Sequence, residues 1–115
     1  MSYVAWTLES TISDRAGMDS VMADAVATVE ANEPQTTHYE WSVSADGSRL
    51  FNYERFEDSA AALVHLAGFG AVAERYMAAV TPTRVQVFGS PSDEVLSALA
   101  AFSPEQWSTI GGFAR

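Results

Sequence analysis

The chain begins with an alternation of apolar and smaller side chains over residues 3–10, "YVAWTLES". Val4, Trp6 and Leu8 fall on one face and alternate with the side chains of the other face. A period of two in residues of this kind predicts a β-strand. Because both faces are largely apolar, we expect the strand to be covered on both sides.

A longer period follows over residues 13–32 and predicts a helix. Ser13 or Asp14 can cap its first turn, and the helix should end before Pro34. One stripe of the helix carries the apolar residues Met18, Val21, Met22, Ala25, Val26 and Val29.

Residues 36–56 carry two aromatic and β-branched runs on either side of Asp46-Gly47, a pair that tolerates positive φ, and they predict a β-hairpin. A two-residue turn there would place three pairs on one face: Tyr39 with Glu54, Trp41 with Asn52, and Val43 with Leu50. The other face would hold His38 near Arg55, Glu40 near Tyr53, and Ser42 near Phe51. A three-residue turn would change all of these partners.

A second helix should begin after Asp58 and be interrupted at Gly68 and Gly70, with a further helical piece over 71–80 and a last strand over 83–89. The order predicts an α+β fold: a ferredoxin-like βαββ(αα)β sandwich with a four-stranded antiparallel sheet and its helices on one face. Apolar residues on the uncovered sheet face predict a homodimer packed sheet to sheet.

The chain then divides into a ferredoxin-like domain over 1–89 and a C-terminal helical extension over 90–115. Ser90 with Pro91, and Ser103 with Pro104, each resemble the start of a short helix. We expect the extension to pack on the same domain or on the partner subunit. Its large apolar side chains, which would anchor it there, are Trp107, Ile110 and Phe113.

Composition restricts the function. The 115 residues, 48% of them hydrophobic, are typical of one soluble domain with no membrane span. Six Lys and Arg against fifteen Asp and Glu argue against nucleic acid as a partner. The lack of cysteine excludes disulfides, thiolate nucleophiles and Cys-based metal sites, and suggests a cytoplasmic location. No nucleotide-binding loop or zinc motif is present, so no cofactor or metal is predicted.

Polar residues within the apolar layers are the candidates for chemistry. Asn52 and Glu54 would face an apolar layer with Tyr39 and Trp41, which suggests a ligand cavity between sheet and helices. A structural hydrogen bond from Glu54 to a helix N-terminus, or exposure at a sheet edge, remains an alternative. His65 lies at the border of the apolar stripe of its helix, where an imidazole could exchange a proton near neutral pH. We expect His38 at the surface or at a dimer interface.

Two stretches, "EPQTTHYEW" and "YERFEDSAAALVHL", resemble the antibiotic biosynthesis monooxygenase family, quinol-monooxygenase-like proteins of the dimeric α+β barrel superfamily. The shared features, which span roughly residues 3–89, are Glu33-Pro34, an aromatic-rich strand, and the order Glu54, Phe56, Asp58, Ala61, His65. The chain departs from the family at Gln35, where glycine is frequent, and at Gly70, where a second histidine is frequent.

The resemblance implies a homodimer whose pocket oxidises a phenolic or quinol-like small aromatic molecule with O₂, without metal or flavin. His65 would be the base, Asn52 and Tyr39 its catalytic hydrogen-bond partners, and Trp6, Trp41, Phe69 and Glu54 would bind the substrate. Two alternatives remain: a non-catalytic barrel that binds a hydrophobic ligand or acts in a stress response, and a haem-binding or haem-degrading member.

Overall fold

The computed structural model describes residues 2–115 and contains one five-stranded sheet with the strand order β2-β3-β1-β4-β5. Along the chain the elements are β1 (Val4–Ile12), α1 (Arg15–Asn32), β2 (Thr36–Val43), β3 (Arg49–Phe56), α2 (Ser59–Phe69), α3 (Ala73–Ala79), β4 (Val80–Gly89), α4 (Asp93–Leu99), a 3₁₀ turn (Ala100–Phe102) and β5 (Glu105–Trp107). The first four strands of the sheet pair antiparallel, which confirms the predicted α+β, ferredoxin-like sandwich.

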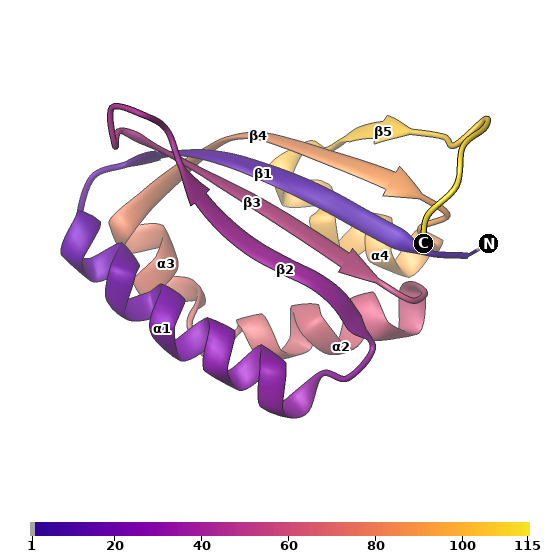
Figure 1. Ribbon diagram of the computed structural model, residues 1–115, viewed down its shortest axis with the longest axis horizontal. Coiled ribbons are helices and arrows are strands. Elements are labelled where there is room, and N and C mark those ends of the chain that lie inside the picture. The colour runs from indigo at the N-terminus through magenta and orange to yellow at the C-terminus, as the bar shows by residue number, and fades with distance from the viewer. Residues whose placement is uncertain (1) are drawn as a thin grey trace.

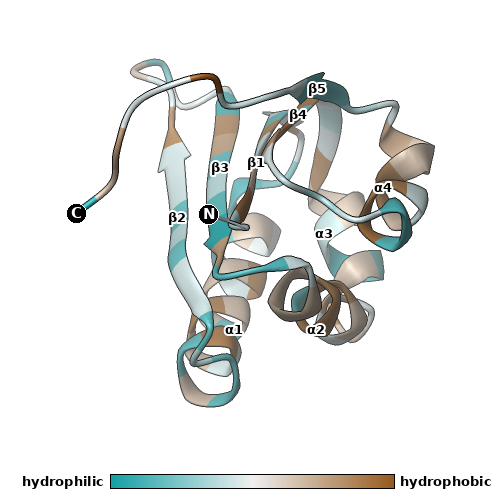
Figure 2. Ribbon diagram, turned by 90° about the vertical axis from the view of Figure 1, so that its right-hand side faces the viewer, coloured by the Kyte–Doolittle hydropathy of each residue, from teal (hydrophilic) through white to brown (hydrophobic). Residues whose placement is uncertain are grey.

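The helices cover one face of the sheet, and the core lies between the two layers (Figure 1 and Figure 2). Two clusters make up this core. One joins Val4, Trp6 and Phe56 to α2 and α4, and the other joins Met18 and Leu50 to α3. No helix of residues 2–115 is long and apolar enough to cross a membrane.

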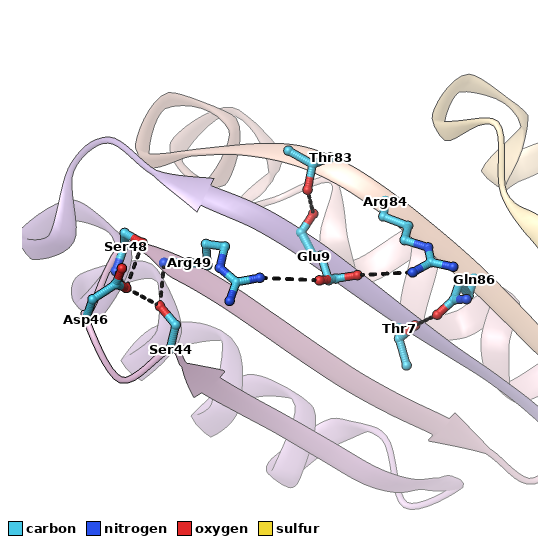
Figure 3. A network of polar contacts seen from close by, with 9 residues as sticks. All are labelled: Thr7, Glu9, Ser44, Asp46, Ser48, Arg49, Thr83, Arg84 and Gln86. Carbon is cyan, nitrogen blue, oxygen red and sulfur yellow. Dashed lines mark hydrogen bonds and ion pairs between the residues drawn. The ribbon is translucent and has the colours of Figure 1, made fainter.

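The β2–β3 hairpin has the register that a two-residue turn predicts, with Tyr39 opposite Glu54 and Trp41 opposite Asn52. Gly47 at the turn adopts a φ of 75°, which favours glycine. Asp46 Oδ1 accepts hydrogen bonds from the hydroxyl and backbone N–H of Ser48 and from the hydroxyl of Ser44 (Figure 3). These bonds lower the pKa of Asp46 to about 2, so its carboxylate remains charged and holds the turn.

Side-chain caps set the starts of the two long helices. Asp14 accepts from the backbone N–H of Gly17, and Asp58 accepts from that of Ala61. The second predicted helix ends at Phe69, and α3 begins at Ala73, which confirms the interruption in the glycine-containing stretch. The short break allows the chain to turn under the sheet and return as β4.

The C-terminal extension differs from the prediction at two places. The helix start expected at Ser90 lies two residues later, because the Ser92 hydroxyl accepts from the N–H of Val95 while Ser90 N–H donates to the carbonyl of Tyr3. The second expected helix, at Ser103, is instead the strand β5.

The open edge of β4 explains this strand. Ser103 adopts a left-handed conformation, with a φ of 49°, that redirects the chain along β4. Glu105, Gln106 and Trp107 then pair in parallel with β4, and the ring of Trp107 stacks on that of Phe88 with 6.4 Å between the centroids. A sheet edge with unpaired backbone groups therefore outweighs the local helix signal.

The sheet face opposite the helices has no helix over it, and its centre is charged. Glu9 of β1 lies 3.9 Å from the guanidinium nitrogens of both Arg49 and Arg84 (Figure 3). Large apolar residues flank this centre: the side chain of Phe51 is 41% exposed and that of Trp107 is 50% exposed. This face is therefore mixed in character rather than uniformly apolar.

Candidate functional site

A cavity of about 60 Å³ lies between the sheet and the helices, and every residue predicted for the site lines it. These are His65, Asn52, Tyr39, Trp6, Trp41, Glu54 and Phe69. The structure adds six residues to the lining: Leu8, Leu66, Tyr76, Val85, Leu99 and Phe102. The walls are thus mainly aromatic and aliphatic, with a few polar groups among them.

Strand alternation brings the polar groups of β3 to this cavity. Asn52 and Glu54 are two residues apart, so both side chains leave the same face of the sheet, toward the helices. His65 and Phe69 are four residues apart on α2 and meet them from the opposite layer. The site therefore depends on the packing of α2 against the sheet.

His65 lies between two carboxylates. Its Nδ1 is 2.8 Å from Oε1 of Glu33, just after α1, and its Nε2 is 2.7 Å from Oε1 of Glu54. The three side chains are only 6–10% exposed. A neutral imidazole carries one N–H and could donate to only one of these carboxylates, so the geometry favours the imidazolium form with both nitrogens donating.

The charge state of His65 follows from opposing effects on its pKa. Burial of the ring acts to lower the pKa, and the hydrogen bond and negative charge of Glu54, together with those of Glu33, act to raise it. The carboxylates outweigh burial, so the pKa of His65 is raised above 6.5. Glu33, His65 and Glu54 together then carry one net negative charge when both carboxyl groups are ionised.

Asn52 is held by Tyr76 of α3. The Tyr76 hydroxyl donates to Asn52 Oδ1 at 2.9 Å, and burial raises the pKa of Tyr76, which keeps this donor protonated. The amide orientation is therefore fixed. Within residues 2–115, nothing accepts a hydrogen bond from Nδ2 of Asn52, although the side chain is buried and lines the cavity.

Aromatic rings enclose these polar groups. The Tyr39 ring meets the His65 ring edge-on with 5.4 Å between the centroids, and the Trp6 ring centroid lies 6.2 Å from that of His65. Trp41 and Phe69 each contact the ring of Tyr76. Burial and the charge of Glu54 raise the pKa of Tyr39, so this hydroxyl stays protonated at neutral pH. Because the lining of the cavity is mainly apolar, it screens charges weakly, and each electrostatic interaction between the polar groups is stronger than it would be in water.

Local sequence patterns did not predict every residue of the site. Glu33 appeared only within the Glu33-Pro34 motif, which was the one available signal for its role. Leu99 and Phe102 belong to the extension, whose position no local pattern determined. The alternative of Glu54 bonding to a helix N-terminus is wrong in this structure, because its Oε1 faces His65. His38, as expected, is exposed.

No arrangement of three or more His, Cys, Asp or Glu side chains suited to hold a metal ion occurs within residues 2–115. Both nitrogens of His65 already face carboxylates, so the ring offers no free nitrogen to a metal or to a haem iron in this arrangement.

Comparison with known proteins identifies the fold. No described protein family and no curated protein sequence matches the chain. Solved structures do match. MupZ from Pseudomonas fluorescens is similar over 100% of this chain and 96% of its own, with a TM-score of 0.80 and 19% sequence identity.

Two further structures extend this similarity. SnoaB from Streptomyces nogalater, a cofactor-independent oxygenase, covers 80% of this chain and 96% of its own, with a TM-score of 0.68 and 22% identity. A proposed antibiotic biosynthesis monooxygenase from Caulobacter crescentus covers 79% and 92%, with a TM-score of 0.69 and 17% identity. The chain therefore has the fold of antibiotic biosynthesis monooxygenase-type proteins, as its sequence motifs indicated.

Proposed function

We propose that this chain oxidises a phenolic or quinol-like small molecule with O₂, without a cofactor, in the cavity beside His65. The observation that carries the proposal is that two buried polar groups line the same aromatic cavity: the carboxylate of Glu54, and the amide of Asn52, whose Nδ2 has no hydrogen-bond acceptor among residues 2–115. A substrate hydroxyl placed between them can give its proton to Glu54 while Asn52 donates a hydrogen bond to its oxygen. The shared fold with a cofactor-independent oxygenase supports this reaction class.

The chemistry then needs little from the protein. Loss of the hydroxyl proton leaves a phenolate, which transfers one electron to O₂ and gives a phenoxyl radical and superoxide. Their combination at a ring carbon that bears a hydrogen forms a peroxide anion, whose terminal oxygen takes the proton back from Glu54. The C–H and O–O bonds then break, the terminal oxygen leaves as water, and a carbonyl remains. The aromatic walls hold the ring and exclude water during these steps.

The geometry changes the role expected for His65. Both of its nitrogens are engaged by carboxylates, so we assign proton acceptance to Glu54 and the support of that carboxylate to His65. Trp6, Trp41 and Phe69 keep their proposed role as walls that contact the ring of the substrate.

Substrate entry requires a side chain to move. A cavity of about 60 Å³ accommodates water-sized groups rather than an aromatic ring. Phe102, which is 36% exposed, is the lining residue most open to solvent and follows the short helix α4. We propose that displacement of Phe102 admits the ring, so that the extension takes part in the site.

The test measures O₂ uptake with a panel of hydroquinones and anthrones. Turnover should fall by about a hundredfold or more in Glu54→Gln and in Asn52→Ala, because each removes a group that contacts the reacting oxygen. Glu57→Gln, at an exposed position three residues along, is the matched control and should retain full activity. Full turnover in both site variants would contradict the assignment. Saturable binding of the aromatics without turnover would instead support the non-catalytic alternative.

A second candidate reaction is an acid–base isomerisation without O₂, in which Glu54 takes a proton from one substrate atom and returns it to another. It is favoured by the observation that both ring nitrogens of His65 face carboxylates, an arrangement that favours a retained proton at the site. Conversion of substrate under anaerobic conditions would support this candidate and exclude the oxidation.

We further propose that two copies pack through the open sheet face. Phe51 and Trp107 lie exposed on that face, and Ile110 and Phe113 of the tail are 100% and 82% exposed. Burial of these side chains against a second copy would remove apolar surface from water. Sedimentation at micromolar concentration should give twice the monomer mass of 12.4 kDa, and Phe51→Asp should reduce it to the monomer. A monomeric wild type would refute this arrangement.

A further inference from the structure

A second cavity of about 60 Å³ lies on the other side of His65, between α1 and the α2–α3 turn. Tyr39, His65 and Phe69 line both cavities, so their rings form the partition between them. Glu54 lines only the first of the two cavities, which we call the inner cavity. Glu33 lines only the second, which we call the outer cavity because Glu33 also borders a groove at the surface. The carboxylates that hold His65 thus belong to different compartments.

Glu33 also borders an open groove at the protein surface. The groove measures about 340 Å³ and is lined in addition by Val26, Val29, Glu30, Pro34, Thr36 and Tyr39. The Thr36 hydroxyl donates to Oε1 of Glu33, the same oxygen that His65 approaches. Oε2 of Glu33 lies on the side of Gly68, where a Cβ atom on residue 68 would stand 3.6 Å from this oxygen. The absence of a side chain at Gly68 leaves that oxygen next to the outer cavity.

We propose that Glu33 is the solvent-side end of a proton-exchange path that runs from Glu54 through His65 to the surface. The inference rests on the proposed function, because it supplies that reaction with its proton balance. Distances of 2.7 and 2.8 Å join the three groups without a gap. The path therefore needs no water between its members.

The proton balance closes over one turnover. When Glu54 takes the hydroxyl proton of the substrate, the Nδ1 proton of His65 passes to Glu33 and then to water in the outer cavity. The three groups hold a constant number of protons before and after each exchange with the substrate and with water. When Glu54 returns its proton to the leaving oxygen, a proton from water crosses Glu33 to Nδ1 and restores the imidazolium.

The ionisable groups around the ring come from every layer packed against it. They are Glu33 after α1, Glu54 from β3 and Tyr39 from β2, with Tyr76 of α3 on the inner cavity. Both tyrosines have a raised pKa and remain neutral near pH 7. Among residues 2–115, the two carboxylates are therefore the groups beside the ring that can exchange a proton with His65 in this range.

The test follows the ring N–H protons of His65 by ¹⁵N NMR in the 115-residue protein, with His38 as the internal reference for an exposed ring. Glu33→Gln keeps the size of the side chain and an oxygen that can accept from Thr36, but it cannot carry a proton. Exchange of the Nδ1 proton with water should slow by at least about fivefold in this variant. Glu94→Gln, at an exposed position of α4 that lines neither cavity nor the groove, should leave the rate unchanged.

A second variant separates proton exchange from charge. Gly68→Ala lies in α2, where its added methyl group meets Glu33 Oε2 at an ordinary contact distance and favours the helix. It should slow Nδ1 exchange while both carboxylates remain. Unchanged exchange in Glu33→Gln and in Gly68→Ala, with folding confirmed by circular dichroism, would overturn the path.

The proton-exchange measurements test the path whether or not the protein catalyses the proposed oxidation. An absence of O₂ uptake in the wild type would refute the proposed oxidation and leave the exchange measurements as the test of the path. If the wild type turns over, Glu33→Gln should lower kcat with little change in KM, because Glu33 lies outside the substrate cavity. An unchanged kcat together with slowed exchange would show that the path does not serve turnover.

Discussion

Removal of the Tyr76 hydroxyl should cost stability that a surface tyrosine does not. In Tyr76→Phe the buried Oδ1 of Asn52 loses the donor that the protein supplies, since Tyr76 is 3% and Asn52 is 2% exposed, and only water inside the adjoining cavity could take its place. A buried polar group left unpaired costs about 1–3 kcal/mol. Because unfolding a chain of this size has a urea m-value of about 1–2 kcal/mol/M, the midpoint should fall by about 1 M.

The assay is urea unfolding followed by tryptophan fluorescence, with Tyr53→Phe on the opposite sheet face as the control. A double-mutant cycle isolates the hydrogen bond: in Asn52→Leu the acceptor is gone, so the further change Tyr76→Phe should cost much less than in the wild type. Equal losses in Tyr76→Phe and Tyr53→Phe, or additive losses in the cycle, would refute the assignment of this bond. If the bond orients Asn52 for a substrate, the folded Tyr76→Phe protein should also lose turnover.

Four further outcomes follow from the structure. Because the pKa of His65 is raised, the folded state binds this proton more tightly than the unfolded chain does, so the stability advantage of the wild type over His65→Gln should be largest below about pH 6.5. The advantage should decline as the pH rises through the folded pKa. Denaturation at a series of pH values measures it, and a difference that does not change with pH would contradict the prediction. Asp58→Ala removes the cap of α2 and should lower the unfolding free energy by about 1 kcal/mol, whereas Asp58→Asn should retain most of it, as urea denaturation can measure. Gly89→Ala should lower the unfolding free energy by at least about 2 kcal/mol, because Gly89 has a φ of 88° and a Cβ there would stand 2.2 Å from the Tyr3 carbonyl oxygen. A variant with the same melting temperature as the wild type would contradict this prediction. Phe102→Ala should lower KM for bulky hydroquinones more than for small ones, and an equal effect on both would exclude Phe102 as the entry residue.

Short-range sequence patterns predicted most of the fold and most of the residues that line the cavity. The alternation in β1, β2 and β3 assigned each side chain to a face, and the turn at Asp46-Gly47 set the register that brings Asn52 and Glu54 beside Tyr39 and Trp41. Once the faces were known, the packing of α2 on the sheet placed His65 against the same layer. These relations hold because backbone periodicity determines direction before any distant contact forms.

Local sequence patterns did not predict the structure of the extension. Ser103-Pro104 has the local signature of a helix start, yet the backbone of β4 offered unpaired hydrogen-bonding groups, and residues 105–107 joined the sheet. Leu99 and Phe102 then became walls of the cavity. Competition between local propensity and a free sheet edge depends on where that edge lies in space, which a window of neighbouring residues does not contain.

The sequence by itself determined the order of the elements, the faces of the strands and the residue types that surround the cavity. Only the tertiary structure decided that Glu33 and Glu54, on either side of His65, hold the ring as an imidazolium, and that Tyr76 fixes the amide of Asn52. Glu33 and His65 are 32 positions apart. The charge state of the site and proton transfer within it depend on distances of a few ångströms between side chains of different elements. Sequence periodicity predicts the direction of each side chain but not these distances.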